Sequence, residues 1–429
     1  MMTSKKKSAK LTRQHPSPFF SRSYGGYTSD QIDFFASAIG ESTRKRTIVD
    51  PMGGQGVALS RNAWKGDNVW LGDINPALSF MACLRSPKLI LNYKTLAEGL
   101  RKKVHRLNRK RRKGGQPEYV DDWFAPTIRD DLYDFGQLAN LSMFDDPFGW
   151  DNDFWRTSEE SQFEIGIVLL AAREFACCRS TDNPTWSKPG GIPREFRLAP
   201  TVLRALSLWE AFAEENVSNI SSKRIGTLTV QRTNAAKCRL YKAPKAHAII
   251  TSPPYANRLD YTKLWAPESE ALACICNRSM TEIRREQIGS TVMRGKSASF
   301  AENPKELPRV AERVLDEIKK DKSASSANYY YPFFRSYAEG LTSAMECTAE
   351  RLKKDGVMVV FVRDTVRKDI LFPTGQIVID VLESTCGLEL VSETKKIIKG
   401  HVGQLRQKAK SGLYGLAQQE WWLAFRRPA

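Results

Sequence analysis

The hydrophobic positions of the chain fall in short runs separated by amphipathic segments, a pattern typical of strands that alternate with helices. A buried strand is expected at residues 47–49, a helix at 55–65 and a second strand at 68–73. A glycine-rich loop lies between the first strand and the helix. Strand, glycine loop, helix and strand in this order indicate a parallel βαβ unit.

The strand pattern resumes in the second half of the chain. Further strands are expected at residues 228–230, 247–250, 356–362, 388–393 and 421–425, and helices at 28–39, 337–352 and 377–382. Thr28 or Ser29 is a candidate N-cap for the first of these helices. Together these elements predict an α/β protein built on a mostly parallel, Rossmann-like sheet.

Two helix-rich stretches interrupt this alternation, at residues 86–225 and 268–328. The first holds helix-like segments at 164–175 and 201–214, and also the densest basic cluster of the chain, at 101–113. Helix-like segments dominate these stretches, in place of the alternating strands and helices around them. We therefore interpret both stretches as helical insertions.

The composition of the 429 residues narrows the class of protein. Hydrophobic residues make up 41%, enough for a substantial core, and no apolar run is long enough to predict a membrane span or a signal peptide. The net charge of +18 favours a polyanionic partner, nucleic acid first, with a basic surface kept for solubility as the alternative. The eight cysteines show no C-x-x-C spacing and there are four histidines, so no metal site is expected.

Residues 251–255 read Thr-Ser-Pro-Pro-Tyr and follow a run of apolar residues. Ser252 offers a hydroxyl, and the carbonyls at Pro253 and Pro254 belong to residues that have no N–H to donate. Tyr255 offers a flat aromatic face. Such a loop can hold a planar group that carries an NH₂, with acceptors at the amine and a ring against its face.

The glycine loop at residues 50–56 reads Asp-Pro-Met-Gly-Gly-Gln-Gly. Its glycines permit a close approach that a Cβ would block, and Asp73 follows the next strand, where ribose hydroxyls need an acceptor. The loop lacks the G-x-G-x-x-G pattern and a following Lys-Ser/Thr, and Asp50 disfavours a polyphosphate. A cationic adenosine ligand, S-adenosylmethionine, fits better; a purely structural turn is the alternative.

These two segments together resemble the amino-group DNA methyltransferases, which methylate N4 of cytosine or N6 of adenine. The family's cofactor motif is Asp-Pro-Phe-x-Gly-x-Gly, and its catalytic motif is Ser/Asp/Asn-Pro-Pro followed by an aromatic residue. The corresponding residues here are Asp50-Pro51-Met52-Gly53-Gly54-Gln55-Gly56 and Ser252-Pro253-Pro254-Tyr255. Met52 stands in the Phe position. The resemblance covers the first 85 residues and roughly 227–265 and 329–429.

The resemblance implies S-adenosylmethionine as the cofactor. The stretch 72–76, Gly-Asp-Ile-Asn-Pro, matches the family's acid after the second strand, and Asn234 stands where the family usually has Asp beside the adenine. Phe19 and Phe20 loosely match the motif that closes over the methionine end. The implied cofactor-binding residues are Asp50, Pro51, Met52, Gly53, Gly54, Gly56, Asp73, Ile74, Asn234 and Phe20.

The implied catalytic residues are Ser252, Pro253, Pro254 and Tyr255. The Ser252 hydroxyl and the Pro253 carbonyl would accept the two amine hydrogens, and Tyr255 would stack on a base extruded from the duplex. No covalent enzyme intermediate is needed. C5-cytosine chemistry is excluded because it uses a catalytic Cys, usually in Pro-Cys, and that dipeptide is absent. Serine at position 252 favours N4-cytosine over N6-adenine.

Basic residues in both insertions and beside the catalytic loop are candidates for contact with the nucleic acid backbone. The candidates are Arg101, Lys102, Arg109, Arg111, Arg112, Arg258, Arg284 and Arg285. A solvated helix face is the alternative for the cluster at 101–113, and an internal ion pair with Asp260 is the alternative for Arg258.

The expected domain organisation is a class I methyltransferase fold divided by the two insertions. Its parts are a disordered basic tail at 1–14, methyltransferase segments at 15–85, 226–267 and 329–429, and helical insertions at 86–225 and 268–328 that are candidates for target recognition.

The expected activity is transfer of a methyl group from S-adenosylmethionine to N4 of a flipped cytosine in double-stranded DNA. Alternatives are an N6-adenine DNA methyltransferase, an RNA amino-methyltransferase and a non-catalytic nucleic-acid-binding subunit. The family suggests a bacterial cytoplasmic protein, with a cognate restriction endonuclease or defence-system protein as a partner and no association with membranes.

Overall fold

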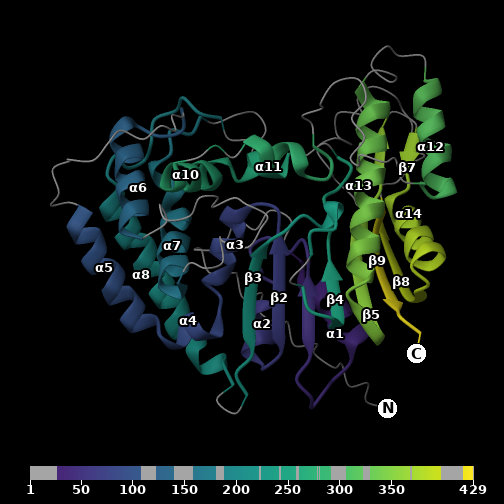
Figure 1. The fold of residues 1–429 in the computed structure, drawn as a ribbon, viewed down its shortest axis with the longest axis horizontal. Coiled ribbons are helices and arrows are strands. Elements are labelled where there is room, and N and C mark those ends of the chain that lie inside the picture. The colour runs from purple at the N-terminus through teal and green to yellow at the C-terminus, as the bar shows by residue number, and fades with distance from the viewer. Residues whose placement is uncertain are drawn as a thin grey trace, which may run out of the picture.

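The described residues of the computed structural model are 27–107, 122–139, 158–179, 188–221, 224–240, 243–257, 260–277, 279, 281–290, 306–321, 329–367, 370–397 and 419–428. They contain a seven-stranded sheet in the order β3-β2-β1-β4-β5-β9-β8 (Figure 1). Its strands are β1 (Thr47–Asp50), β2 (Asn68–Asp73), β3 (Thr227–Arg232), β4 (Ala246–Thr251), β5 (Leu352–Arg363), β8 (Glu389–Ile397) and β9 (Gln419–Arg426).

Strands β3, β2, β1, β4 and β5 are parallel, and β9 runs antiparallel to both of its neighbours, β5 and β8. The predicted α/β class with a mostly parallel, Rossmann-like sheet is confirmed. The chain leaves β1 for β2 on one side and later returns to β4 on the other side. The carboxyl ends of β1 and β4 therefore lie at the point where the strand order reverses, which is the usual place for a ligand in such sheets.

Alternate residues of the central strands supply two separate cores, as the period of two in a strand requires. Ile48 packs into one core with α1 (Ser29–Ile39), α2 (Ser60–Trp64) and α3 (Pro76–Cys83). Val49 packs into the other with α12 (Arg309–Lys320), α13 (Tyr331–Ala349) and α14 (Thr374–Asp380). Helices thus cover both faces of the sheet (Figure 1).

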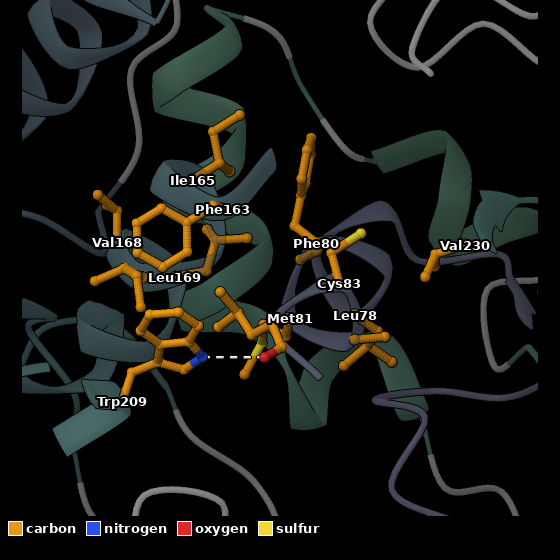
Figure 2. Close-up of a cluster of buried hydrophobic side chains, with 14 of the residues drawn as sticks. Leu78, Phe80, Met81, Cys83, Phe163, Ile165, Val168, Leu169, Trp209 and Val230 are labelled. Atoms are coloured by element: carbon orange, nitrogen blue, oxygen red, sulfur yellow. Dashed lines mark hydrogen bonds between the residues drawn. The ribbon is translucent and has the colours of Figure 1, made fainter. Parts of the chain in front are cut away.

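The stretch between α3 and β3 is helical in its described residues. It contains α4 (Pro87–Leu91), α5 (Tyr93–Leu107), α6 (Pro126–Leu138), α7 (Glu159–Phe175), α8 (Leu198–Asn216) and η4 (Val217–Asn219). Figure 2 shows how Phe163 and Trp209 meet side chains of α3, and the Trp209 indole Nε1 donates to the Leu84 carbonyl at 3.0 Å. A Cβ at Gly166 would lie 2.9 Å from the Phe80 carbonyl oxygen, so glycine permits this close approach of α7 to α3. These helices therefore share one core with the sheet.

The second helical stretch crosses the sheet edge where the parallel strands end (Figure 1). It begins after α9 (Tyr261–Leu264) and contains α10 (Ala266–Cys276) and α11 (Thr281–Glu286), followed by α12. The remaining elements are η5 (Ala235–Lys237), the ribbon β6 (Thr365–Arg367) with β7 (Ile370–Phe372), and the π-helix η7 (Val381–Thr385).

Most elements lie where the hydrophobic pattern predicts them, and α1 has the expected N-cap at Thr28. The helix expected at 55–65 is shorter, because only α2 (Ser60–Trp64) is helical. Gly56 has a φ of 65°, and residues 51–59 form turns instead. The helix expected at 337–352 also differs: α13 (Tyr331–Ala349) begins and ends earlier, and β5 follows it at once.

Two further observations concern the whole fold. Cys238 and Cys347 are joined by a disulfide with their Cα atoms 5.3 Å apart, which the cysteine spacing did not predict. Among the helices of the described residues, none combines the length and apolar character that a membrane span requires.

Candidate active site

A single pocket brings together most of the loops that the sequence singles out. It lies at the carboxyl ends of β1, β2, β3 and β4, where the strand order reverses. Its lining includes Tyr27, Pro51, Met52, Gly53, Gly54, Asp73, Ile74, Asn75, Thr233, Asn234, Ser252, Pro254, Tyr261, Trp265, Gln287 and Ile288. The glycine loop and the Ser-Pro-Pro loop, about two hundred residues apart in the chain, therefore open into the same space.

The glycine loop is held tightly against the end of β2. The Gly53 amide donates to the Gly72 carbonyl at 2.8 Å, and the Gly54 amide donates to a carboxylate oxygen of Asp73 at 3.0 Å. Gly54 has a φ of 52° and open space where a Cβ would stand. A Cβ at Gly56 would lie 2.4 Å from a methyl of Leu71, so this glycine serves loop packing. The loop forms a cradle that a side chain at Gly54 would partly fill.

Asp73 stands at the end of β2 and faces the pocket. Its two carboxylate oxygens accept the amides of Gly54, at 3.0 Å, and Asn75, at 2.8 Å. Burial raises the pKa of Asp73 to about 6, against the partial compensation of these hydrogen bonds. Hydroxyl donors or a cation from a ligand would stabilise the ionised form of such a buried carboxylate.

Asp50 is almost fully buried and does not line the pocket itself, whereas the next two residues, Pro51 and Met52, do. Its carboxylate accepts the Tyr27 hydroxyl at 2.9 Å and the Met52 amide at 3.1 Å. Burial raises the pKa of Asp50 to about 7. The predicted contact of Asp50 with a ligand is thus indirect in this structure, because Asp50 positions Tyr27 and the loop.

Replacing Asp50 with asparagine is expected to change the pH dependence of stability. The folded-state pKa, about 7, lies above the ordinary 3.8, so folding disfavours the ionised carboxylate. This penalty is absent below the ordinary value, grows by about 1.4 kcal/mol for each pH unit up to the folded-state pKa, and is constant above it. The unfolding free energy of Asp50→Asn, relative to the parent, should therefore rise across that window in urea titrations.

Asp30→Asn is the control for this measurement. Asp30 is exposed, and its hydrogen bond to Lys396 lowers the pKa of its carboxyl. The unfolding free energy of Asp30→Asn, relative to the parent, should show no such rise with pH. A flat difference for Asp50→Asn over the same pH range would contradict the assigned environment of Asp50.

The Ser-Pro-Pro-Tyr loop is fixed by two tyrosine hydroxyls. The Tyr337 hydroxyl, on α13, donates to the Pro254 carbonyl at 2.9 Å, and the Tyr255 amide donates to the Tyr261 hydroxyl at 3.3 Å. Burial raises the pKa of both Tyr337 and Tyr261, so both remain protonated at neutral pH. Ser252 and Pro254 line the pocket, and the Arg363 guanidinium lies 5.2 Å from the centre of the Tyr255 ring.

The far wall of the pocket comes from the segment after α11, which the motifs did not identify. Gln287 donates to a carboxylate oxygen of Asp260 at 3.0 Å and accepts the Thr262 hydroxyl at 3.0 Å. Asn234 lines the pocket, and its side chain accepts the Lys237 amide and donates to the Glu286 carbonyl. Only a fold that returns residues 281–290 to the sheet edge makes these neighbours, so no local sequence pattern reveals Gln287 or Ile288.

Several basic candidates are engaged in ion pairs. Arg101 pairs with Glu210, Lys102 with Glu98 at 2.7 Å, and Arg284 with Asp260 at 2.6 Å. Arg285 is exposed on α11. The remaining candidates lie outside the described residues: Phe20, Arg109, Arg111, Arg112 and Arg258.

Metal ligands do not gather in the part of the chain that the structure describes. No group of three or more His, Cys, Asp or Glu side chains is arranged there to hold an ion. The polar side chains that line the pocket include hydroxyls, amides and the carboxylate of Asp73.

Comparison with known proteins finds a distant likeness to Type II methyltransferases. The chain is similar to the Type II methyltransferase M.AvaI of Nostoc sp. (strain PCC 7120 / SAG 25.82 / UTEX 2576) and to the protein of the same name of Anabaena variabilis. Each is 26% identical over 183 residues, which is 39% of this chain and 35% of the relative. The match thus spans about a third of the length of these curated relatives. No family model matches the sequence.

Proposed function

We propose that the protein transfers a methyl group from S-adenosylmethionine to the N4 amine of a cytosine extruded from duplex DNA. One observation carries the proposal: Asp73 and the glycine cradle open into the same pocket as Ser252 and the carbonyl-bearing proline loop. A cofactor held by the first set would present its reactive group to an amine held by the second. The distant likeness to Type II methyltransferases agrees with this reading.

The residues present fit S-adenosylmethionine. Asp73 can accept the ribose hydroxyls, and the open space at Gly54 admits a ligand against the loop backbone. The raised pKa values of Asp73 and Asp50 favour a cationic ligand over a polyphosphate, because a nearby positive charge stabilises both carboxylates. When bound, the cofactor supplies a methyl group activated by a sulfonium. Ile74 and Ala235 offer apolar contacts on the side where the resemblance places the adenine.

The loop residues orient the amine. An exocyclic amine on an aromatic ring is a poor nucleophile because its lone pair is delocalised, and acceptors for its two hydrogens favour a localised lone pair. We assign the Ser252 hydroxyl and the Pro253 carbonyl as the two acceptors; Ser252 lines the pocket, whereas Pro253 is buried and is not among the lining residues. Tyr337 and Tyr261 fix the neighbouring backbone, which preserves the alignment required for in-line transfer.

Tyr255 would stack on the extruded base, a contact that is generally worth roughly 1–3 kcal/mol. The Arg363 guanidinium lies close to the Tyr255 ring, so the base would either stack on Tyr255 beside this guanidinium or displace the guanidinium from the ring. Serine at position 252 favours cytosine. As part of the same proposal, the protein works in a bacterial cytoplasm with a cognate restriction endonuclease or another defence protein.

A transfer assay tests this function. The purified protein would be incubated with methyl-labelled S-adenosylmethionine and either duplex DNA, the same DNA denatured, or structured RNA. Label in duplex DNA is expected. Preferential label in RNA would replace the DNA proposal with an RNA amino-methyltransferase. Absence of cofactor binding in calorimetry would support a non-catalytic subunit instead.

Replacing Tyr337 with phenylalanine should slow turnover without affecting the cofactor. The substitution removes the hydroxyl that donates to the Pro254 carbonyl and keeps the buried ring, so the catalytic loop loses an anchor while the core stays filled. We expect kcat to fall roughly tenfold, the scale of one neutral hydrogen bond, with the Kd for S-adenosylmethionine unchanged.

Tyr331→Phe on the same helix is the matched control for Tyr337→Phe. The Tyr331 hydroxyl accepts from Arg335, outside the pocket. Equal kcat values for Tyr337→Phe and the parent enzyme would show that Tyr337 does not position the loop.

A further inference from the structure

The segment 188–197, between α7 and α8, lies over the helical layer beside the sheet, at the end of that layer near α10 (Figure 1). Arg173, in the last turn of α7, pairs with Glu268 of α10 at 2.5 Å. Its guanidinium also lies 5.6 Å from the centre of the Trp265 ring, and Trp265 lines the pocket. The end of α7, from which the segment continues, is therefore next to a residue that lines the pocket.

The backbone of this segment is anchored to the end of α7. The amides of Arg194 and Glu195 both donate to the Glu174 carbonyl, at 2.9 and 3.0 Å. The Gly191 amide donates to the Cys177 carbonyl at 2.9 Å, and a Cβ at Gly191 would lie 1.9 Å from the Cys178 carbonyl oxygen. Glycine is thus required at position 191, and three backbone hydrogen bonds tie the segment to the end of α7.

This anchored segment exposes apolar side chains that find no place in the core. Ile192 is 83% exposed and Phe196 is 58% exposed. Exposed basic residues flank them: Lys188, Arg194 and Arg197. A fixed loop does not normally present apolar side chains this openly unless they meet a partner.

We propose that residues 188–197 form a duplex-DNA contact surface, termed here the wedge loop. Ile192 and Phe196 pack into the DNA beside the base that leaves the stack, and Lys188, Arg194 and Arg197 contact phosphates. This inference rests on the proposed DNA methyltransferase function and adds the side chains that meet the duplex.

The chemistry of the wedge loop fits DNA better than a protein surface. Its charged residues are three basic and one acidic, Glu195, which pairs with Arg197 at 3.6 Å, and the chain as a whole carries a net charge of +18. Phosphates neutralise such a surface with release of counterions, which favours binding. Apolar side chains of the Ile and Phe type are the kind that proteins insert between base steps.

The energetics also suit this position. Unstacking a base costs a few kcal/mol, and an apolar side chain that enters the disturbed step covers the exposed base faces. Because the wedge-loop backbone is already fixed by hydrogen bonds to Glu174 and Cys177, binding loses little additional conformational entropy.

The test compares two kinds of variant for binding to a short, labelled duplex by fluorescence anisotropy over a range of salt. The double variant Ile192→Ser/Phe196→Ser should bind roughly tenfold more weakly at each salt concentration, with an unchanged salt slope, because it removes no phosphate contact. Arg194→Gln and Arg197→Gln should each reduce the salt slope by about 1. Calorimetry should show the same Kd for S-adenosylmethionine in all of them.

Ile225→Ser is the matched control. Ile225 is 48% exposed and precedes β3, so it lies at the opposite edge of the sheet from the pocket. Its variant should bind the duplex as the parent protein does.

Two outcomes would overturn the wedge-loop proposal. One is parent-like duplex affinity for Ile192→Ser/Phe196→Ser in a protein that still methylates DNA; this would leave the proposed function intact. The other is that Ile192→Ser/Phe196→Ser loses a self-association that the parent protein shows in sedimentation, while its DNA affinity is unchanged. This result would make the surface an interface between copies of the chain. Failure of the parent protein itself to label DNA would instead contradict the proposed function.

Discussion

Replacing Ser252 with alanine is expected to lower kcat for methyl transfer to DNA by roughly 100- to 1000-fold, the scale of one catalytic hydrogen bond to the reacting group. The variant loses the hydroxyl that would accept an amine hydrogen, and Ser252 lines the pocket between the two loops. Its neighbours Tyr337 and Tyr261 still fix the loop backbone. The Kd for S-adenosylmethionine should stay near the parent value, because Asp73 and the glycine cradle are untouched.

The kcat and the Kd are measured separately, by single-turnover transfer and by calorimetry. Ser207→Ala is the control, since Ser207 is an exposed residue of α8 whose hydroxyl donates to the Leu203 carbonyl. Normal turnover by Ser252→Ala would show that the Ser-Pro-Pro-Tyr loop has been assigned the wrong role.

Replacing Asp73 with alanine is expected to weaken S-adenosylmethionine binding by roughly 100-fold or more, since hydrogen bonds to a charged group contribute roughly 1.5–3 kcal/mol each. The carboxylate would hold the ribose, and it also accepts the amides of Gly54 and Asn75, so its loss loosens the cradle as well. The expected defect lies in the cofactor Kd, measured by calorimetry.

Asp73→Asn separates the two roles of Asp73. Asparagine keeps one acceptor oxygen for the amides of Gly54 and Asn75 and removes the negative charge, so Asp73→Asn should disturb the loop less than Asp73→Ala while still binding the cofactor poorly. Asp30→Ala, at an exposed ion pair with Lys396, should bind as the parent does. If both Asp73 variants bind S-adenosylmethionine with the parent affinity, Asp73 does not bind the cofactor as proposed.

The fold and the two ends of the pocket were predictable because they depend on local patterns. Apolar runs set β1, β2 and β4, and the glycines that the backbone requires at positions 54 and 56 are visible in the sequence. Parallel strands bring their carboxyl ends to one edge, and there Asp73 and Ser252 line the same pocket.

The rest of the site depends on contacts between distant segments. Tyr337 is a buried aromatic residue of an amphipathic helix, and nothing in its sequence context reveals that its hydroxyl reaches the Pro254 carbonyl. Gln287 reaches the pocket through Asp260 and Thr262, which belong to another segment.

The basic candidates show a second reason why sequence falls short. A cluster of arginines and lysines has the same composition whether it faces phosphate or carboxylates. In the structure Arg101 and Arg284 meet Glu210 and Asp260, so part of their charge is already compensated within the protein. The wedge loop was not predicted either, because a sequence does not show which apolar residues stay exposed. The exposure of Ile192 and Phe196 follows only from how α7 and α8 are joined.

The most direct test of the proposed chemistry is to identify the methylated nucleoside. Duplex DNA from an unmethylated source would be incubated with the protein and methyl-labelled S-adenosylmethionine, digested to nucleosides and analysed by mass spectrometry. Labelled N4-methylcytosine is the predicted product, and N6-methyladenine would keep the mechanism but change the base. Labelled 5-methylcytosine, or DNA without any methylated nucleoside while the cofactor binds normally, would contradict transfer to an exocyclic amine of DNA.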